Sequence, residues 1–218
     1  MSAEPTAIEL IPYEKRLHED RRWAMAQGGG YFRKDNDVFK TMYRIAGRLD
    51  ALGIPYAVVG GMALFEHGFE RFTDDVDLLV TPENLKVIHE RLEGLGYVPP
   101  FTGSKQLRDV ESGVRIEFLI SGAFPGDGKP KPVAFPNPAD VGIDRDGIVF
   151  LSLPKLIELK LASGMTGGIH RMKDFTDVVE MIKIRQLPAD FAEQLDPYVR
   201  GRYLEFWTAL QEPTNPEP

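Results

Sequence analysis

Apolar residues recur at helical spacing in two segments of the first half of the chain. Between residues 37 and 52 an apolar position returns every three or four residues, which predicts a helix that Gly53 ends. The apolar face of this helix consists of Phe39, Met42, Ile45, Leu49 and Leu52. A second helix is expected from Pro82 to Gly96, because proline suits a first helical position and glycine often ends a helix.

Short apolar runs between turn residues predict the strands of a sheet. The segments concerned are 54–60, 75–81, a strand pair within 108–121 that turns near Ser112, and a hairpin within 141–152 around Asp146-Gly147. A short helix is expected at 62–68. Residues 122–140 are rich in glycine and proline and predict a long loop.

The pattern after Ser152 changes to helix, with segments expected at 153–164, 172–186 and 188–211, the last of them broken or double. The layout predicts an α/β (α+β) fold in which a mixed sheet flanked by helices precedes a C-terminal helical region. The expected divisions are an N-terminal extension (1–36), a core (37–152), a helical region (153–211) and a disordered tail (212–218). Within the extension, Gly28 to Phe32 is expected to be a flexible joint.

Composition narrows the class of protein. The 218 residues are enough for a hydrophobic core, and the absence of cysteine excludes disulfides and thiolate metal sites. No apolar run approaches the ~20 residues of a membrane span, and no signal peptide is recognised, so we expect no membrane partner and a cytoplasmic location. The net charge of −7 argues against non-specific nucleic-acid binding by the whole surface, although a local basic patch is compatible with it.

Two aspartates lie inside the apolar run 75–80. Because strand side chains alternate, Asp75 and Asp77 share one face with Leu79. By the same alternation Glu117 faces the same way as Arg115, so it joins the aspartates if its strand is their neighbour. Three carboxylates would then form the oxygen-rich site that Mg²⁺ prefers. Without a cation they would repel one another.

Other interpretations of these carboxylates are open at this point. Asp75 and Asp77 could protect an edge strand against aggregation. Glu117 could pair with Arg115, and Asp109 and Glu111 are rival third carboxylates.

The glycine pair before the aspartates suggests a phosphate site. Gly60 and Gly61 end one strand and open a helix, where a backbone without side chains can approach a ligand closely. The N–H groups of Gly61, Met62 and Ala63 lie at a helix N-terminus, which attracts phosphate. A phosphate cradle followed by a two-carboxylate strand favours phosphoryl or nucleotidyl transfer with two metal ions.

The stretch "GGMALFEHGFERFTDDVDLLV" resembles the DNA polymerase β-like nucleotidyltransferase superfamily, and in finer detail its abortive-infection AbiEii-type branch. In that superfamily Gly-Gly or Gly-Ser precedes Asp-x-Asp or Asp-x-Glu by about a dozen residues, and a third carboxylate follows on a later strand. Gly60, Gly61, Asp75, Asp77 and Glu117 occupy these positions. Two departures are Gly61 in place of the serine and Glu117 in place of the commoner aspartate.

The resemblance extends over roughly residues 54–185, through "LPKLIELKLAS" and "HRMKDFTDVVEMI". It implies that Lys160 contacts the triphosphate and that Asp174, with Asp177 one turn later, belongs to a recurrent motif. Arg71 and Thr73 precede the strand that carries Asp75 and Asp77, which we call the metal strand. Arg71 would bind either a phosphate or a carboxylate. Asp174 and Asp177 would orient Lys160 or Lys173, or form surface ion pairs.

The activity that the resemblance implies is transfer of a nucleoside monophosphate from a nucleoside triphosphate to an acceptor hydroxyl. Asp75 and Asp77 would hold both metals, Mg²⁺ or alternatively Mn²⁺, and Glu117 would hold the catalytic metal and help deprotonate the hydroxyl. The implied acceptor is RNA such as the tRNA acceptor end, in a toxin-like protein with a cognate antitoxin. A small hydroxylated acceptor and a non-catalytic, antitoxin-like module are the alternatives.

Overall fold

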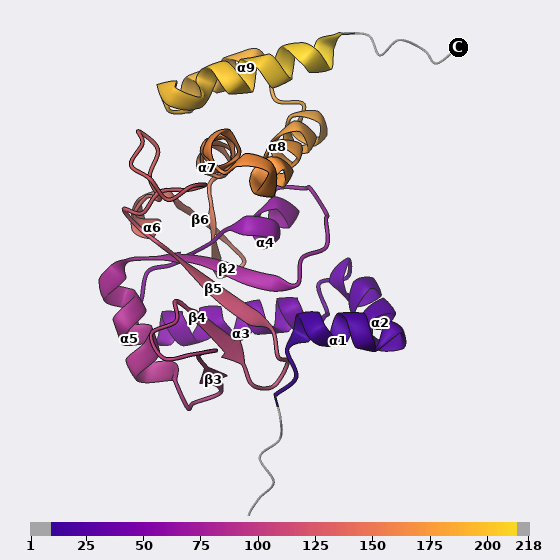
Figure 1. The fold of residues 1–218 in the computed structure, drawn as a ribbon, viewed down its shortest axis with the longest axis vertical. Helices are drawn as coiled ribbons and strands as arrows, with labels where there is room; N and C mark the ends of the chain where they lie inside the picture. The colour runs from indigo at the N-terminus through magenta and orange to yellow at the C-terminus, as the bar shows by residue number, and fades with distance from the viewer. Residues whose placement is uncertain (1–9, 213–218) are drawn as a thin grey trace, which may run out of the picture.

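The computed structural model describes residues 10–212, and within them a seven-stranded mixed sheet with helices around it (Figure 1). The strands are β1 (Ala57–Val58), β2 (Asp75–Val80), β3 (Tyr97–Val98), β4 (Gln106–Asp109), β5 (Arg115–Ile120), β6 (Gly142–Arg145) and β7 (Ile148–Leu151). Their order in the sheet is β3-β4-β5-β2-β1-β7-β6. The predicted fold class, a mixed α/β sheet with helices followed by a helical region, is therefore confirmed.

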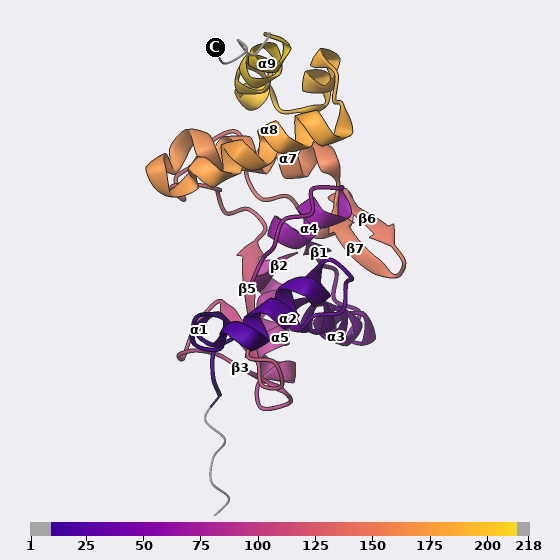
Figure 2. The same cartoon turned by 90° about the vertical axis from the view of Figure 1, so that its right-hand side faces the viewer.

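The α-helices of the sheet region are α1 (Tyr13–Glu19), α2 (Arg21–Tyr31), α3 (Asp37–Ala51), α4 (Gly60–Glu66), α5 (Pro82–Leu92) and α6 (Pro138–Val141). Those of the C-terminal region are α7 (Leu153–Thr166), α8 (Met172–Arg185) and α9 (Pro197–Gln211), with the short 3₁₀ helices η1 (Gly168–Arg171) and η2 (Ala189–Gln194). Figure 2 shows α7, α8 and α9 beyond one end of the sheet, while α1 and α2 lie on the other side of β2 and β5.

The helix starts follow from capping residues in the sequence. The Asn36 side chain accepts a hydrogen bond from the Phe39 N–H at the start of α3. The Thr81 hydroxyl accepts one from the Asn84 N–H at the start of α5, whose first residue is Pro82. Each cap satisfies a backbone donor that the first helical turn leaves free. The caps add to the apolar spacing and to Pro82, on which the two starts were predicted.

Strand β2 is an interior strand of the sheet, and its neighbours decide which side chains meet. It runs parallel to β5, with Asp77 opposite Glu117, and antiparallel to β1. The two aspartates at its beginning are partly exposed, whereas Leu78 to Val80 are fully buried. One end of β2 therefore contributes to the core, and the other end presents carboxylates.

Three expectations about local structure are wrong, the first being the helix expected from Pro82 to Gly96, which ends already at Leu92. Gly28 to Phe32 is no flexible joint, because α2 continues through the glycines to Tyr31. The Tyr31 ring is fully buried against Phe39, Phe65 and Phe72, and this aromatic packing outweighs the poor helix propensity of glycine. The strand expected at 54–60 is reduced to β1, because the chain turns into α4 already at Gly60.

The boundaries that we proposed from the sequence between the N-terminal extension, the core, the helical region and the tail remain predictions. The first nine residues of the extension and all but Glu212 of the expected disordered tail lie outside the described residues. Between residues 10 and 212, no helix has both the length and the apolar character needed to cross a membrane.

Candidate active site

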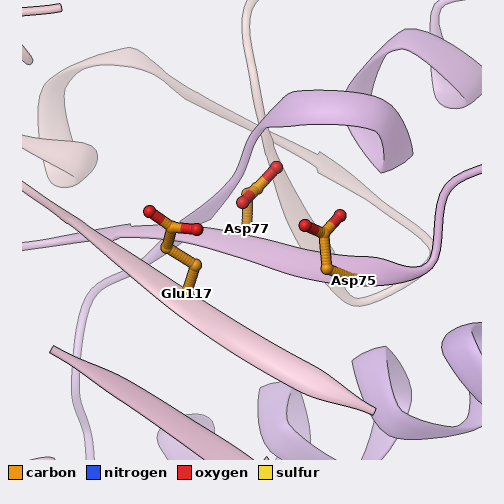
Figure 3. Close-up of side chains that lie close together, drawn as sticks. All are labelled: Asp75, Asp77 and Glu117. Carbon is orange, nitrogen blue, oxygen red and sulfur yellow. The ribbon is translucent and has the colours of Figure 1, made fainter. Parts of the chain in front are cut away.

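Three carboxylates from adjacent strands form the centre of the site. Asp75 and Asp77 on β2 and Glu117 on β5 rise from the same face of the sheet (Figure 3). One carboxylate oxygen from each lies within 4.8 Å of the others. The strand alternation and the placement of Glu117 were thus predicted correctly. The cluster supplies the hard oxygen ligands that Mg²⁺ or Mn²⁺ takes.

The electrostatics of the cluster fit a cation site. Burial, together with the neighbouring charges of Asp75 and Glu117, raises the pKa of Asp77 to about 7. Asp75 is held from two sides, because Thr73 Oγ1 donates to its Oδ1 at 2.8 Å and Arg115 Nη2 donates to its Oδ2 at 2.5 Å. Arg115 neutralises only part of the negative charge of the three carboxylates. A divalent cation would relieve the repulsion that remains among them.

The rival interpretations of the carboxylates are not supported. Because β2 lies between β5 and β1, its aspartates do not protect an edge strand. Asp109 accepts hydrogen bonds from Arg44 and Thr41, and Glu111 pairs with the same arginine. Neither rival belongs to the cluster. Arg115 pairs with Asp75 instead of Glu117.

The glycine pair is required first by the protein's own packing. Gly60 has φ +59°, and a Cβ atom at this position would overlap the Asp77 carboxylate. A Cβ at Gly61 would lie 2.7 Å from Cβ of Thr73. The two glycines therefore let α4 begin directly against the carboxylate strand. Met62 is buried, and its sulfur accepts a hydrogen bond from Tyr31, so only its backbone could meet a ligand.

Gly60→Ala should destabilise the protein by about 1–3 kcal/mol more than Gly53→Ala, because only the first change adds overpacking to backbone strain. Gly53 is a matched control: its φ is +64°, and a Cβ there would meet no atom within 4 Å. Urea unfolding of both variants measures the difference. Equal losses would show that Gly60 matters for its backbone angle alone.

A cluster of four charges, three of them buried and one partly exposed, flanks the carboxylates. It consists of Arg71, Lys160, Asp174 and Asp177, and we call it the four-charge cluster. Lys160 Nζ donates to Asp174 Oδ1 at 3.0 Å and to Asp177 Oδ2 at 2.6 Å. Arg71 donates from Nε to Asp177 Oδ1 at 2.9 Å and from Nη2 to Oδ2 at 3.2 Å. Of the options open at the sequence level, Arg71 binds a carboxylate, and Asp174 and Asp177 orient Lys160.

A cleft of about 780 Å³ connects the carboxylates with this cluster. Its lining includes all of the predicted site residues except Met62, namely Gly60, Gly61, Arg71, Thr73, Asp75, Asp77, Glu117, Lys160 and Asp174. The lining also includes residues that no motif of the sequence singles out, among them Leu17, His18, Ala24 and Ser163. Arg115, which strand alternation predicts on the face of Glu117, lines the cleft as well. Nothing in the sequence indicates that α1 and α2 fold back onto the cleft.

The metal-free protein should lose stability through Asp77 as the pH rises from about 4 to about 7. The pKa of Asp77 in the folded chain is about 7, above its ordinary value of 3.8, so its contribution is complete below pH 4 and lost above pH 7. Asp75 and Glu117 raise this pKa, and the cations Lys160 and Arg115 lower it. The measurement is the free energy of unfolding of parent and Asp77→Asn in chelator at several pH values. The difference between them should grow with pH; a constant difference would contradict the shifted pKa.

Comparisons with known proteins give structural likeness at low identity. Neither a protein-family model nor a curated protein sequence matches the chain. Similar solved structures include the antibiotic-resistance factor ANT(2'')-Ia, at 14% identity and TM-score 0.47 over 78% of this chain and 94% of that one. A nucleotidyltransferase-like protein from Paracoccidioides brasiliensis is 18% identical, with TM-score 0.48 over 79% of this chain and 87% of that one.

A third similar structure is the Megavirus polyadenylate synthase, at 16% identity and TM-score 0.41 over 86% of this chain and 40% of that one. At such identities and TM-scores, likeness does not establish function. The site geometry has to carry it.

Proposed function

We propose that the protein is a nucleotidyltransferase (EC 2.7.7-type) that uses Mg²⁺ or Mn²⁺ and a nucleoside triphosphate. The observation that carries this proposal is the set of three carboxylates, with oxygens within 4.8 Å of one another, in the wall of a cleft. Asp75, Asp77 and Glu117 would hold the metal ions. When bound, these ions would polarise the phosphoryl oxygens and neutralise charge that develops during transfer.

The chain's own residues suit an in-line transfer. The acceptor oxygen attacks the α-phosphorus, the bond to the β-phosphate breaks, and pyrophosphate leaves. Glu117 is the carboxylate that we assign to receive the acceptor proton. Asp75 is less suited to that task, because Thr73 and Arg115 already occupy both of its oxygens.

The triphosphate would lie toward the four-charge cluster. Lys160 is 8% exposed and uses two of its three N–H groups on Asp174 and Asp177, which leaves one for a phosphate oxygen. Arg171 and Lys173 line the same cleft and are exposed. The backbone N–H groups of Gly61 and Met62 would add neutral donors at the start of α4.

The finer assignment rests on the sequence resemblance. Under this assignment the protein is an AbiEii-type, toxin-like enzyme of the cytoplasm. It modifies RNA such as the tRNA acceptor end and is controlled by a cognate antitoxin. Because the chain carries a net charge of −7, RNA would need a local basic surface, and Arg171 and Lys173 offer one at the cleft.

The test is incubation of the protein with Mg²⁺ and each labelled nucleoside triphosphate, with total RNA, with hydroxylated small molecules or with neither. Asp77→Asn serves as the matched control. Label on RNA that the control does not produce supports the proposal in full. Label on a small molecule supports nucleotidyl transfer and overturns the RNA acceptor. No label under any condition favours the non-catalytic module.

A further inference from the structure

We propose that Asp177 is a positioning residue that fixes the loop before the metal strand and the cleft lysine at the same time. The inference rests on the proposed function, since it concerns the metal and nucleotide site. Asp177 is 3% exposed and does not line the cleft, so it does not touch a substrate. Its role must therefore act through the residues that it binds.

Both carboxylate oxygens of Asp177 are occupied. Arg71 approaches them through Nε and Nη2 in a two-pronged contact, and Lys160 shares Oδ2 at 2.6 Å. Such paired, charge-assisted hydrogen bonds fix geometry as well as charge. One side chain of α8 thus holds a cation from α7 and a cation from the loop that leads into β2.

The loop 68–74 transmits the effect to the metal site. Arg71 anchors it to α8, and Phe72 packs on the buried ring of Tyr31 at 5.0 Å between ring centroids. One residue later, the Thr73 hydroxyl donates to Asp75. If Arg71 is released, Thr73 and the Asp75 carboxylate lose the support that fixes their orientation.

Asp174 has a different position in the four-charge cluster. It lines the cleft, and its second oxygen accepts from Ser163 Oγ at 2.7 Å. It holds Lys160 but makes no contact with the loop. The proposal therefore assigns the coupling between loop and lysine to Asp177 alone.

Asp177→Asn should weaken metal binding by about ten- to a hundred-fold, the range typical of residues that orient metal ligands. The amide keeps the size of the side chain but replaces one acceptor oxygen with a donor. The measurement is a titration of the protein with Mn²⁺ alone, in which the loss of the free-ion EPR signal reports how much Mn²⁺ is bound. It needs no enzymatic assay. Arg71→Lys should weaken Mn²⁺ binding in the same direction, because lysine cannot form the two-pronged contact.

Asp109 and Arg44 provide matched controls. Arg44 contacts buried Asp109 through Nε at 3.1 Å and Nη2 at 2.7 Å, and joins α3 to β4 away from the cleft. The arginine side chains are similarly exposed, 33% for Arg44 and 29% for Arg71. Asp109→Asn and Arg44→Lys should lose fold stability to a similar extent and bind Mn²⁺ as the parent does.

The outcomes separate the inference from the proposed function. Weaker Mn²⁺ binding in the Asp177 or Arg71 variant, with unchanged controls, supports the positioning role. Parent-like binding in both of these variants overturns it and leaves the metal site intact. A parent protein that binds no Mn²⁺ overturns the proposed function. If Asp177→Asn does not fold, Arg71→Lys gives the same decision.

Discussion

Replacing Asp77 with asparagine should abolish nucleotidyl transfer and raise the stability of the metal-free protein. The change removes a proposed metal ligand, and it removes one of three carboxylates that repel each other. Each unit by which a pKa is raised corresponds to about 1.4 kcal/mol. Screening at the partly exposed cluster reduces that value, so we expect a gain of about 1–2 kcal/mol at pH 7.5 in chelator.

Thermal or urea unfolding in chelator and in Mg²⁺ measures this result. Mg²⁺ should stabilise the parent by about 2.7 kcal/mol at a hundred times its dissociation constant, and the variant much less. Asp109→Asn is the control of opposite sign, because Asp109 is buried and paired with Arg44. Removing its charge strands a cation and should cost stability. A large loss of stability in metal-free Asp77→Asn would refute the interpretation of these carboxylates as a metal site.

Lys160→Ala should destabilise the protein by about 3–5 kcal/mol, the cost of leaving buried charges without their partner. Asp174 and Asp177 are 5% and 3% exposed, and the change takes the ammonium group from both; Asp177 keeps Arg71, so the loss falls mainly on Asp174. The family resemblance implies only a triphosphate contact for Lys160, and the structure adds that this lysine neutralises buried carboxylates. A loss of nucleotide affinity must therefore be measured on the folded fraction.

Lys183→Ala is the matched control for this change. Lys183 also pairs with a carboxylate of α8, but this pair with Glu180 is more exposed, with side-chain exposures of 49% for Lys183 and 33% for Glu180. Exposed pairs of this kind contribute about 0–1 kcal/mol. Guanidinium unfolding of both variants gives the comparison. Similar small losses would mean that Lys160 is solvated and that the four-charge cluster does not form.

The sequence was most informative where local rules act. The alternation of side chains along a strand was enough to place Asp75 and Asp77 on one face, and apolar spacing and Pro82 were enough to indicate where α3 and α5 begin. The position of Glu117 required one further assumption, that its strand lies beside β2. The structure supplies that pairing, with Asp77 opposite Glu117.

Contacts between distant segments could not be predicted in this way. Arg71 and Asp177 are 106 residues apart, and no periodicity connects them. The same applies to the packing of α2: three consecutive glycines indicate a break by propensity, but the buried ring of Tyr31 keeps the segment helical. The sequence indicated that position 60 needs a glycine so that the backbone can approach a ligand. In the structure the glycine is needed because a Cβ atom there would overlap the Asp77 carboxylate.

The long separation between Arg71 and Asp177 also has a consequence for protein synthesis. All three carboxylates have been translated once Glu117 is added, but the partner of Arg71 follows sixty residues later. Chains fold as they emerge, beginning with their N-terminal parts. A nascent chain therefore carries all three proposed metal ligands before α8 exists to brace the loop, so we expect the site to become competent only after the C-terminal helices have been made.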